Sequence, residues 1–164
     1  MNILIKIRDY IEKVVLVFAV IMLSMVAILI AMQVLLRSVN IGVDWTEEFS
    51  RFSYVGVTFL GSVLVVTQGK HITIDFLAGL LPPFLRRALL IAVHLLMAVF
   101  MGICVYGSTL IMSAAKGVRS NSMAWFELNY IYGAVLASCA LMIFVSIVRA
   151  LEFAVLKKEL PKAV

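Results

Sequence analysis

Charged residues are scarce in this chain of 164 residues, at 14%, while hydrophobic residues make up 64% of it. Soluble domains are typically about 25% charged and about 45–50% apolar. A soluble fold of this size would still expose roughly a third of the surface of its unfolded chain to water. The shortage of charge therefore excludes an ordinary soluble domain and a disordered chain, and integral membrane protein is the class that fits.

Cysteine and histidine are also rare, with two of each. Cys104 and Cys139 lie in long apolar runs without a CxxC spacing, which is typical of buried thiols and excludes a disulfide scaffold. Only one histidine, His94, lies inside such a run, so a haem held by two histidines is not indicated. The sequence shows no Ser/His/Asp set, phosphate-binding loop or cluster of acids with metal-ligand spacing. We therefore predict no enzyme activity, no cofactor and no metal site.

Long apolar runs are what the sequence has instead. A bilayer core of about 30 Å needs about 20 apolar residues of helix, and four runs reach or approach this length. The first run is too long for the apolar part of a cleaved signal peptide, so we expect it to be retained. We predict an all-α integral membrane protein in which residues 1–164 form one four-helix domain, with short interfacial helices at 1–13 and 71–87. The predicted spans are 14–36, 45–68, 88–115 and 128–148.

Lysine and arginine are unevenly distributed between the segments that flank these spans. Ten of the 14 lie in the two terminal segments and the segment between the second and third spans, and four lie in the other two segments. Because short cytoplasmic segments are enriched in Lys and Arg, we predict that both termini are cytoplasmic. The net charge of +5 then belongs to the cytoplasmic face. Anionic membrane lipid is the expected partner there, and nucleic acid is not.

The spans themselves offer little chemistry for a transported solute. His94 is the one titratable residue well inside a span, Gln33 is the main uncharged polar residue, and no span contains an internal proline. Ion-coupled carriers bind substrate and ions at broken helices near the membrane midplane. The chain alone is therefore a poor candidate for a carrier, a pore or a pump, and His94 is interpreted as a packing residue.

The most unusual segment opens the second span. Asp44 followed by Glu47 is typical of a capped helix start, and Arg51 can pair with Glu47 at i,i+4 or with Glu48 at i,i+3. Trp45 suits the level of the membrane interface. Two interpretations stay open at this point. The segment is either a capped, aromatic-anchored helix end with a local salt bridge, or a set of charges that face a protein partner because lipid would not accept them.

The same segment carries a family resemblance. Residues 44–48 with Arg51, then Gly61 within the second span, then the stretch from His71 to Asp75, are similar to the small membrane subunit of tripartite ATP-independent periplasmic (TRAP) transporters, the DctQ-like family. The length of the chain and its four predicted spans fit the same family. The resemblance implies that the residues in contact with partner proteins are Trp45, Glu47, Glu48, Arg51, Gly61, His71 and Asp75.

The resemblance also implies a function in the bacterial inner membrane. Family members pair with a large membrane subunit, expected here to be a separate chain, which carries substrate and sodium by an elevator-type motion. A periplasmic binding protein delivers the substrate, an organic acid such as a C4-dicarboxylate or sialic acid. The small subunit is a scaffold that supports the large subunit and does not carry substrate itself. The second-span region of this chain is most similar to the sialic-acid branch.

Three other classes of small membrane protein fit the length but not the residues. A four-helix drug exporter needs an acid inside its first span, and a quinone-linked thiol oxidase needs paired cysteines at a membrane face. A cytochrome-like anchor needs a second histidine at matching depth. The exporter and the haem-linked or quinone-linked anchor remain the alternatives to a transporter scaffold.

Overall fold

The computed structural model of the chain describes residues 2–68 and 80–155. These residues form four helices, each of which is long and apolar enough to cross a membrane. The fold confirms the predicted all-α integral membrane protein with four spanning helices. The helices are α1 (Asn2–Ser38), α2 (Asp44–Gln68), α4 (Pro83–Ala114) and α5 (Asn129–Val155).

The first helix is longer than the predicted span because no residue interrupts it. The interfacial helix predicted at 1–13 is continuous with the span, and the two form the single helix α1. Beyond the end of α1, Asn40 takes the left-handed conformation (φ 58°). The Ile41 N–H there donates to the Leu36 carbonyl at 3.0 Å, and the Asn40 N–H donates to the Arg37 carbonyl at 3.1 Å. This pair of bonds is a Schellman motif, which ends a helix and turns the chain.

The two adjacent prolines, Pro82 and Pro83, stand at the start of a helix. Pro83 is the first residue of α4, a position that suits proline because an N–H there has no partner within the helix. The helix consequently begins five residues before the predicted start at residue 88. Most of the interfacial helix predicted at 71–87 falls on residues 69–79, which lie outside the described residues.

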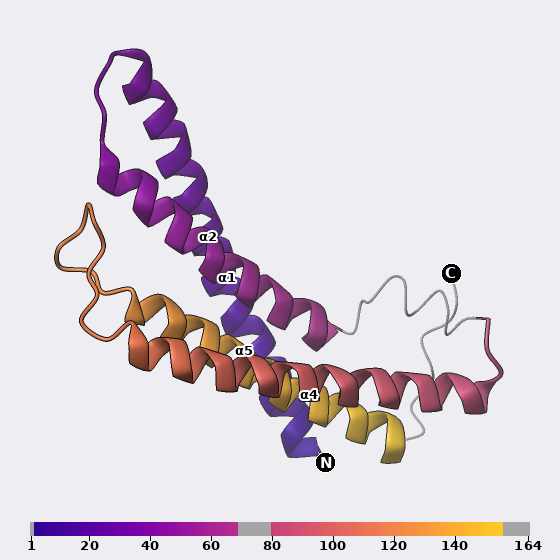
Figure 1. Cartoon of the computed structure of the whole chain (residues 1–164). Helices are drawn as coiled ribbons and strands as arrows, with labels where there is room; N and C mark the ends of the chain where they lie inside the picture. The colour runs from indigo at the N-terminus through magenta and orange to yellow at the C-terminus, as the bar shows by residue number, and fades with distance from the viewer. Residues whose placement is uncertain (1, 69–79, 156–164) are drawn as a thin grey trace.

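The four helices pair as two hairpins. α1 packs along α2, α4 packs along α5, and the hairpins contact each other mainly through α2 and α5 (Figure 1). The hairpins diverge toward the connecting segments 39–43 and 115–128 (Figure 1). We call this end of the molecule the loop end. The opposite end, where α1 begins and α2 and α5 finish, is called the terminal end.

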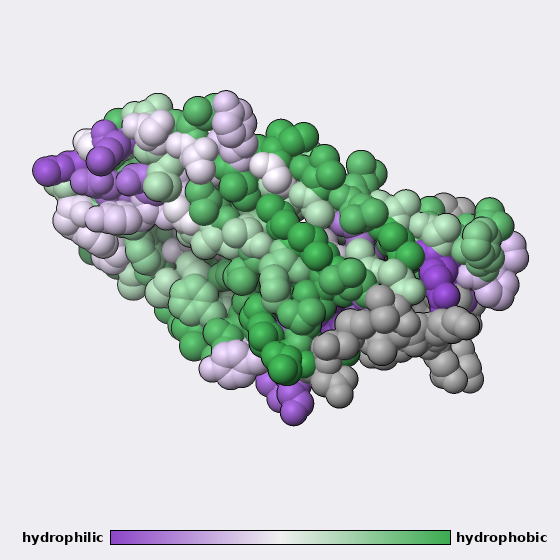
Figure 2. All heavy atoms as spheres, turned by 90° about the horizontal axis from the view of Figure 1, so that it is seen from below, coloured by the Kyte–Doolittle hydropathy of each residue, from purple (hydrophilic) through white to green (hydrophobic). Residues whose placement is uncertain are grey.

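A small core lies where the two hairpins meet. Val63 of α2 and Cys139, Met142 and Val145 of α5 are fully or almost fully buried there, with Val15 of α1 beside them. Most other large apolar side chains are exposed, as expected for helices that face lipid. Figure 2 shows a broad hydrophobic surface that separates hydrophilic side chains at the two ends of the molecule.

Candidate functional site

The entrance to α2 begins the candidate site, and its first turn is organised by a threonine. The helix begins at Asp44, which lies in its first turn. Thr46 is buried, and both its hydroxyl and its N–H donate to the Val43 carbonyl, at 2.7 and 3.3 Å. The helix start predicted at Asp44 or Trp45 is therefore confirmed, and the capping role of the Asp44 side chain stays a prediction.

Two charged residues of the α2 entrance project away from the chain. Arg51 pairs with Glu47 at 3.3 Å, which confirms the predicted i,i+4 salt bridge. The side chains of Arg51 and Glu47 are 72% and 65% exposed, respectively. Trp45, two residues before Glu47, is exposed as well. These three side chains are available to a partner or to the membrane interface.

The Glu48 side chain is hydrogen-bonded to another part of the chain. Its carboxylate accepts hydrogen bonds from the Ser122 N–H, at 2.9 Å, and from the Ser122 hydroxyl. The alternative pairing of Glu48 with Arg51 is not formed. Close by, the Phe52 ring stacks on Phe126 with 5.5 Å between ring centroids and 14° between ring planes. The entrance of α2 is therefore fastened to the 115–128 segment of the other hairpin, and we call this pair of contacts the loop-end latch.

The 115–128 segment folds back so that its two halves are hydrogen-bonded to each other. Arg119 and Glu127 form an antiparallel bridge. The Ser120 N–H donates to the Phe126 carbonyl at 3.0 Å, and the Leu128 N–H donates to the Val118 carbonyl at 3.1 Å. These bonds fix the position of Phe126 and so align its ring with that of Phe52.

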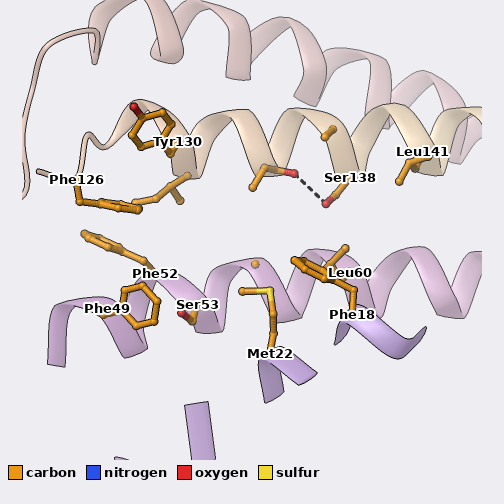
Figure 3. Close-up of a pocket in the computed structure, with 14 residues that line it drawn as sticks. Phe18, Met22, Phe49, Phe52, Ser53, Leu60, Phe126, Tyr130, Ser138 and Leu141 are labelled. Carbon is orange, nitrogen blue, oxygen red and sulfur yellow. Dashed lines mark hydrogen bonds between the residues drawn. The ribbon is translucent and has the colours of Figure 1, made fainter. Parts of the chain in front are cut away.

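An apolar groove of about 390 Å³ lies between the hairpins, below the loop-end latch. Figure 3 shows Phe18 and Met22 of α1, Leu60 of α2 and Leu141 of α5 among its lining residues. None of the described residues that line it is charged. The hydroxyl of Ser138, which also lines the groove, donates to the Ala134 carbonyl at 2.9 Å within α5. The groove is therefore suited to an apolar occupant and not to an ion or an organic acid.

The terminal end holds a buried polar network that joins three helices. Arg8 of α1 lies 2.5 Å from Glu152 of α5, and the two residues are only 6% and 2% exposed. Arg149 lies 3.5 Å from the same carboxylate and donates to the Thr67 carbonyl in the last turn of α2. Asp9, at 2.6 Å from Arg8, completes the network. A cation at the C-terminal end of α2 also interacts favourably with the helix dipole.

This network was missed by reasoning from the sequence. From the sequence, Arg8 and Arg149 are only two of the cations that indicate the membrane topology. The available signal was Glu152 three residues after Arg149 at the end of an apolar helix. An acid and a base at i,i+3 can pair, but nothing in the sequence shows that the N-terminal turn of α1 joins them.

His94 is a packing residue, as predicted. It is buried on α4, and its ring stacks on Phe153 of α5 with centroids 5.8 Å apart. Within residues 2–68 and 80–155, no three His, Cys, Asp or Glu side chains are placed to hold a metal ion. Both cysteines are free thiols: Cys139 is buried and Cys104 is half-buried.

The remaining predicted contact residues divide into one that is described and two that are not. Gly61 lies on α2 with no atom within 4 Å of the place where a Cβ would stand. The fold of this chain therefore does not require a glycine there. His71 and Asp75 lie outside the described residues.

Comparison with known proteins gives a consistent family. Residues 25–155 match the family described as "Tripartite ATP-independent periplasmic transporters, DctQ component". Two proteins of Haemophilus influenzae, each named "Putative TRAP transporter small permease protein", are 30% identical over 104 residues and 28% identical over 109 residues. The matches cover 63% and 66% of this chain and 65% and 66% of the relatives. The chain thus spans just under two thirds of the length of these relatives.

Proposed function

The chain belongs to the DctQ family of TRAP transporter components, and we propose that it is the small subunit that supports a larger, substrate-carrying membrane subunit. A member of this family is part of a transporter and not an enzyme. Its four apolar helices make it a multi-pass protein of the inner membrane. The proposal further includes sodium coupling, an organic acid of the C4-dicarboxylate or sialic-acid type as substrate, and delivery by a periplasmic binding protein.

The observation that carries the scaffold role is the position of the polar side chains. The described ion pairs and the loop-end latch lie at the two ends of the helices, where the chain itself satisfies most of them. His94 packs on Phe153, next to Glu152 at the terminal end, and the groove between the ends has no charged lining. Carriers of organic anions and sodium need polar groups at broken helices. The described helices are unbroken. This favours a scaffold role for the chain over a carrier role.

One exposed face of α2 supports contact with the large subunit. Along this face, which we call the α2 stripe, exposed residues recur every three to seven positions, as expected for one side of a helix. Gly61 and Ser62 lie on the same side and leave room for a close neighbour. Small residues allow helices to approach each other closely within a membrane. The exposed members of the α2 stripe are Glu47, Arg51, Tyr54, Thr58 and Val65.

The α2 stripe is tested by co-purification of an affinity-tagged chain with its large subunit. Gly61→Leu should reduce recovery of the large subunit at least tenfold, because the added side chain would separate two packed helices. Arg51→Ala should also reduce recovery. An exposed ion pair contributes only about 0–1 kcal/mol, whereas a charge left unpaired under a partner costs about 3–5 kcal/mol.

Two matched variants serve as controls. Gly102→Leu on α4 also places a side chain where no atom lies within 4 Å, and Lys116→Ala removes an exposed cation at the loop end. Both should leave recovery unchanged. If Gly61→Leu and Arg51→Ala keep full recovery of the large subunit, the α2 stripe faces lipid and the proposed contact surface is wrong.

A further inference from the structure

The groove between the hairpins is closed at both of its ends. Toward the terminal end it stops at Leu60 and Leu141, which pack against the buried core. Toward the loop end, the stacked rings of Phe52 and Phe126 bridge the two hairpins (Figure 3). Between these limits α2 and α5 do not fill the space between them, and the hairpins stay apart.

The depth of the groove matches one leaflet of a bilayer. Its α2 wall runs over twelve residues from Phe49 to Leu60, and the eleven steps between them rise about 16 Å at about 1.5 Å per residue. One leaflet contributes about half of a hydrocarbon core of about 30 Å. Ala134 and Ala137 line the groove and are exposed, so it is open from the side. An apolar groove that opens into hydrocarbon fills with it, because an empty space forfeits dispersion contacts.

The size of the groove fits a hydrocarbon chain. A volume of about 390 Å³ over that length gives a mean cross-section of at least about 24 Å². A hydrocarbon chain in van der Waals contact at about 4 Å needs about 15–20 Å². The groove therefore has room for a hydrocarbon chain along its whole length.

We infer that the groove binds one acyl chain of a membrane phospholipid from the leaflet at the loop end. The chain contacts Phe18 and Met22 of α1, Leu60 of α2 and Leu141 of α5, and so joins the hairpins where their own side chains do not meet. The lipid headgroup lies at the loop end. The exposed aromatic ring of Tyr130, which lines the groove, suits the interface level there.

The experiment uses the full chain in vesicles of phosphatidylethanolamine and phosphatidylglycerol that contain a small fraction of phosphatidylethanolamine with a diazirine in one acyl chain. After irradiation, mass spectrometry locates the labelled residues. We expect labelling of Met22, Leu60 and Leu141 to be at least fivefold stronger than labelling of Val99, which is exposed on α4. When most lipid is removed with detergent before irradiation, the groove labelling should persist, while labelling of Val99 disappears.

A matched pair of variants tests whether the labelled site is the groove. Ala137→Leu fills it and should reduce labelling of Met22 and Leu60 at least threefold. Ala140→Leu, one turn along α5 at an exposed position outside the groove, should leave the labelling unchanged. The smaller change Ala137→Val should give an intermediate reduction, which covers the case in which the leucine variant fails to fold.

Three results would overturn the inference. If the groove residues are labelled no more strongly than Val99, the label reports the lipid that surrounds the whole protein and not a bound chain. Equal effects of Ala137→Leu and Ala140→Leu would place the bound chain elsewhere. The third is loss of the groove labelling when the chain is labelled together with its large subunit, which would assign the groove to a side chain or segment of that subunit.

Discussion

Glu152 lies between two arginines that come from distant parts of the chain, Arg8 at 2.5 Å and Arg149 at 3.5 Å. Buried ion pairs contribute little net stability compared with apolar side chains of the same size, because desolvation of the charges offsets their attraction. Removing one partner is different, because the remaining charge stays buried without compensation. The network at the terminal end therefore makes the position of α1 against α5 sensitive to single residues.

Glu152→Ala should lower the free energy of unfolding by about 3–5 kcal/mol, since it leaves Arg149 without its acid and Arg8 paired only with the half-exposed Asp9. Thermal unfolding of the purified chain in detergent measures the effect. Asp9→Ala is the control, because the Asp9 side chain is 52% exposed and an exposed pair contributes about 0–1 kcal/mol. The double variant Arg8→Met with Glu152→Leu should recover part of the loss, because only Arg149 then stays without an acid. Equal melting of Glu152→Ala and Asp9→Ala would show that the pair is not buried.

Among the elements, the 115–128 segment joins α4 to α5 and also contacts α2 of the other hairpin at the loop end. It is held to α2 by hydrogen bonds from Ser122 to Glu48 and by the stack of Phe126 on Phe52. Below this latch the groove separates the hairpins. They come back into contact at the core near Val63 and, beyond it, at the terminal-end network. The latch is therefore the contact that sets the spacing of the hairpins at this end.

Glu48→Ala should loosen the 115–128 segment and leave the helices intact. A hydrogen bond to a charged group contributes about 1.5–3 kcal/mol, so protection from hydrogen exchange at the N–H groups of residues 118–128 should fall about tenfold or more. Hydrogen exchange with mass spectrometry measures this change. Glu47→Ala, in the same turn but paired only with Arg51, should leave protection unchanged. Unchanged protection in Glu48→Ala would mean that the stacked rings alone hold the segment.

The sequence predicted the elements better than the contacts between them. The four spans follow from the lengths of the apolar runs, and the pairing of Glu47 with Arg51 follows from their spacing of four residues. The partner of Glu48 could not be predicted, because Ser122 is 74 residues away in another hairpin. The burial of Arg8 could not be predicted either, since its acid is 144 residues away and depends on how the hairpins pack.

On the scale of the whole molecule, the distribution of Lys and Arg predicts which end faces the cytoplasm. The two terminal segments and the segment between the second and third spans carry ten of the 14 cations. Alkaline phosphatase, which is active only outside the cytoplasm, should therefore be active when fused after Asn40 or Asn121. It should be inactive when fused after Gly79 or at the C-terminus. Activity at the C-terminus would contradict an arrangement with both termini in the cytoplasm.

The role that we propose for the whole molecule is to support a transporter without carrying the substrate itself, and uptake into liposomes tests this proposal most directly. Liposomes would contain this chain alone, its large subunit alone or both subunits, each with and without the periplasmic binding protein and an inward sodium gradient. Radiolabelled sialic acid and a C4-dicarboxylate would serve as substrates. We predict no uptake by this chain alone and concentrative uptake of one organic acid only when all components and the gradient are present. Concentrative uptake into liposomes that contain only this chain would contradict the account.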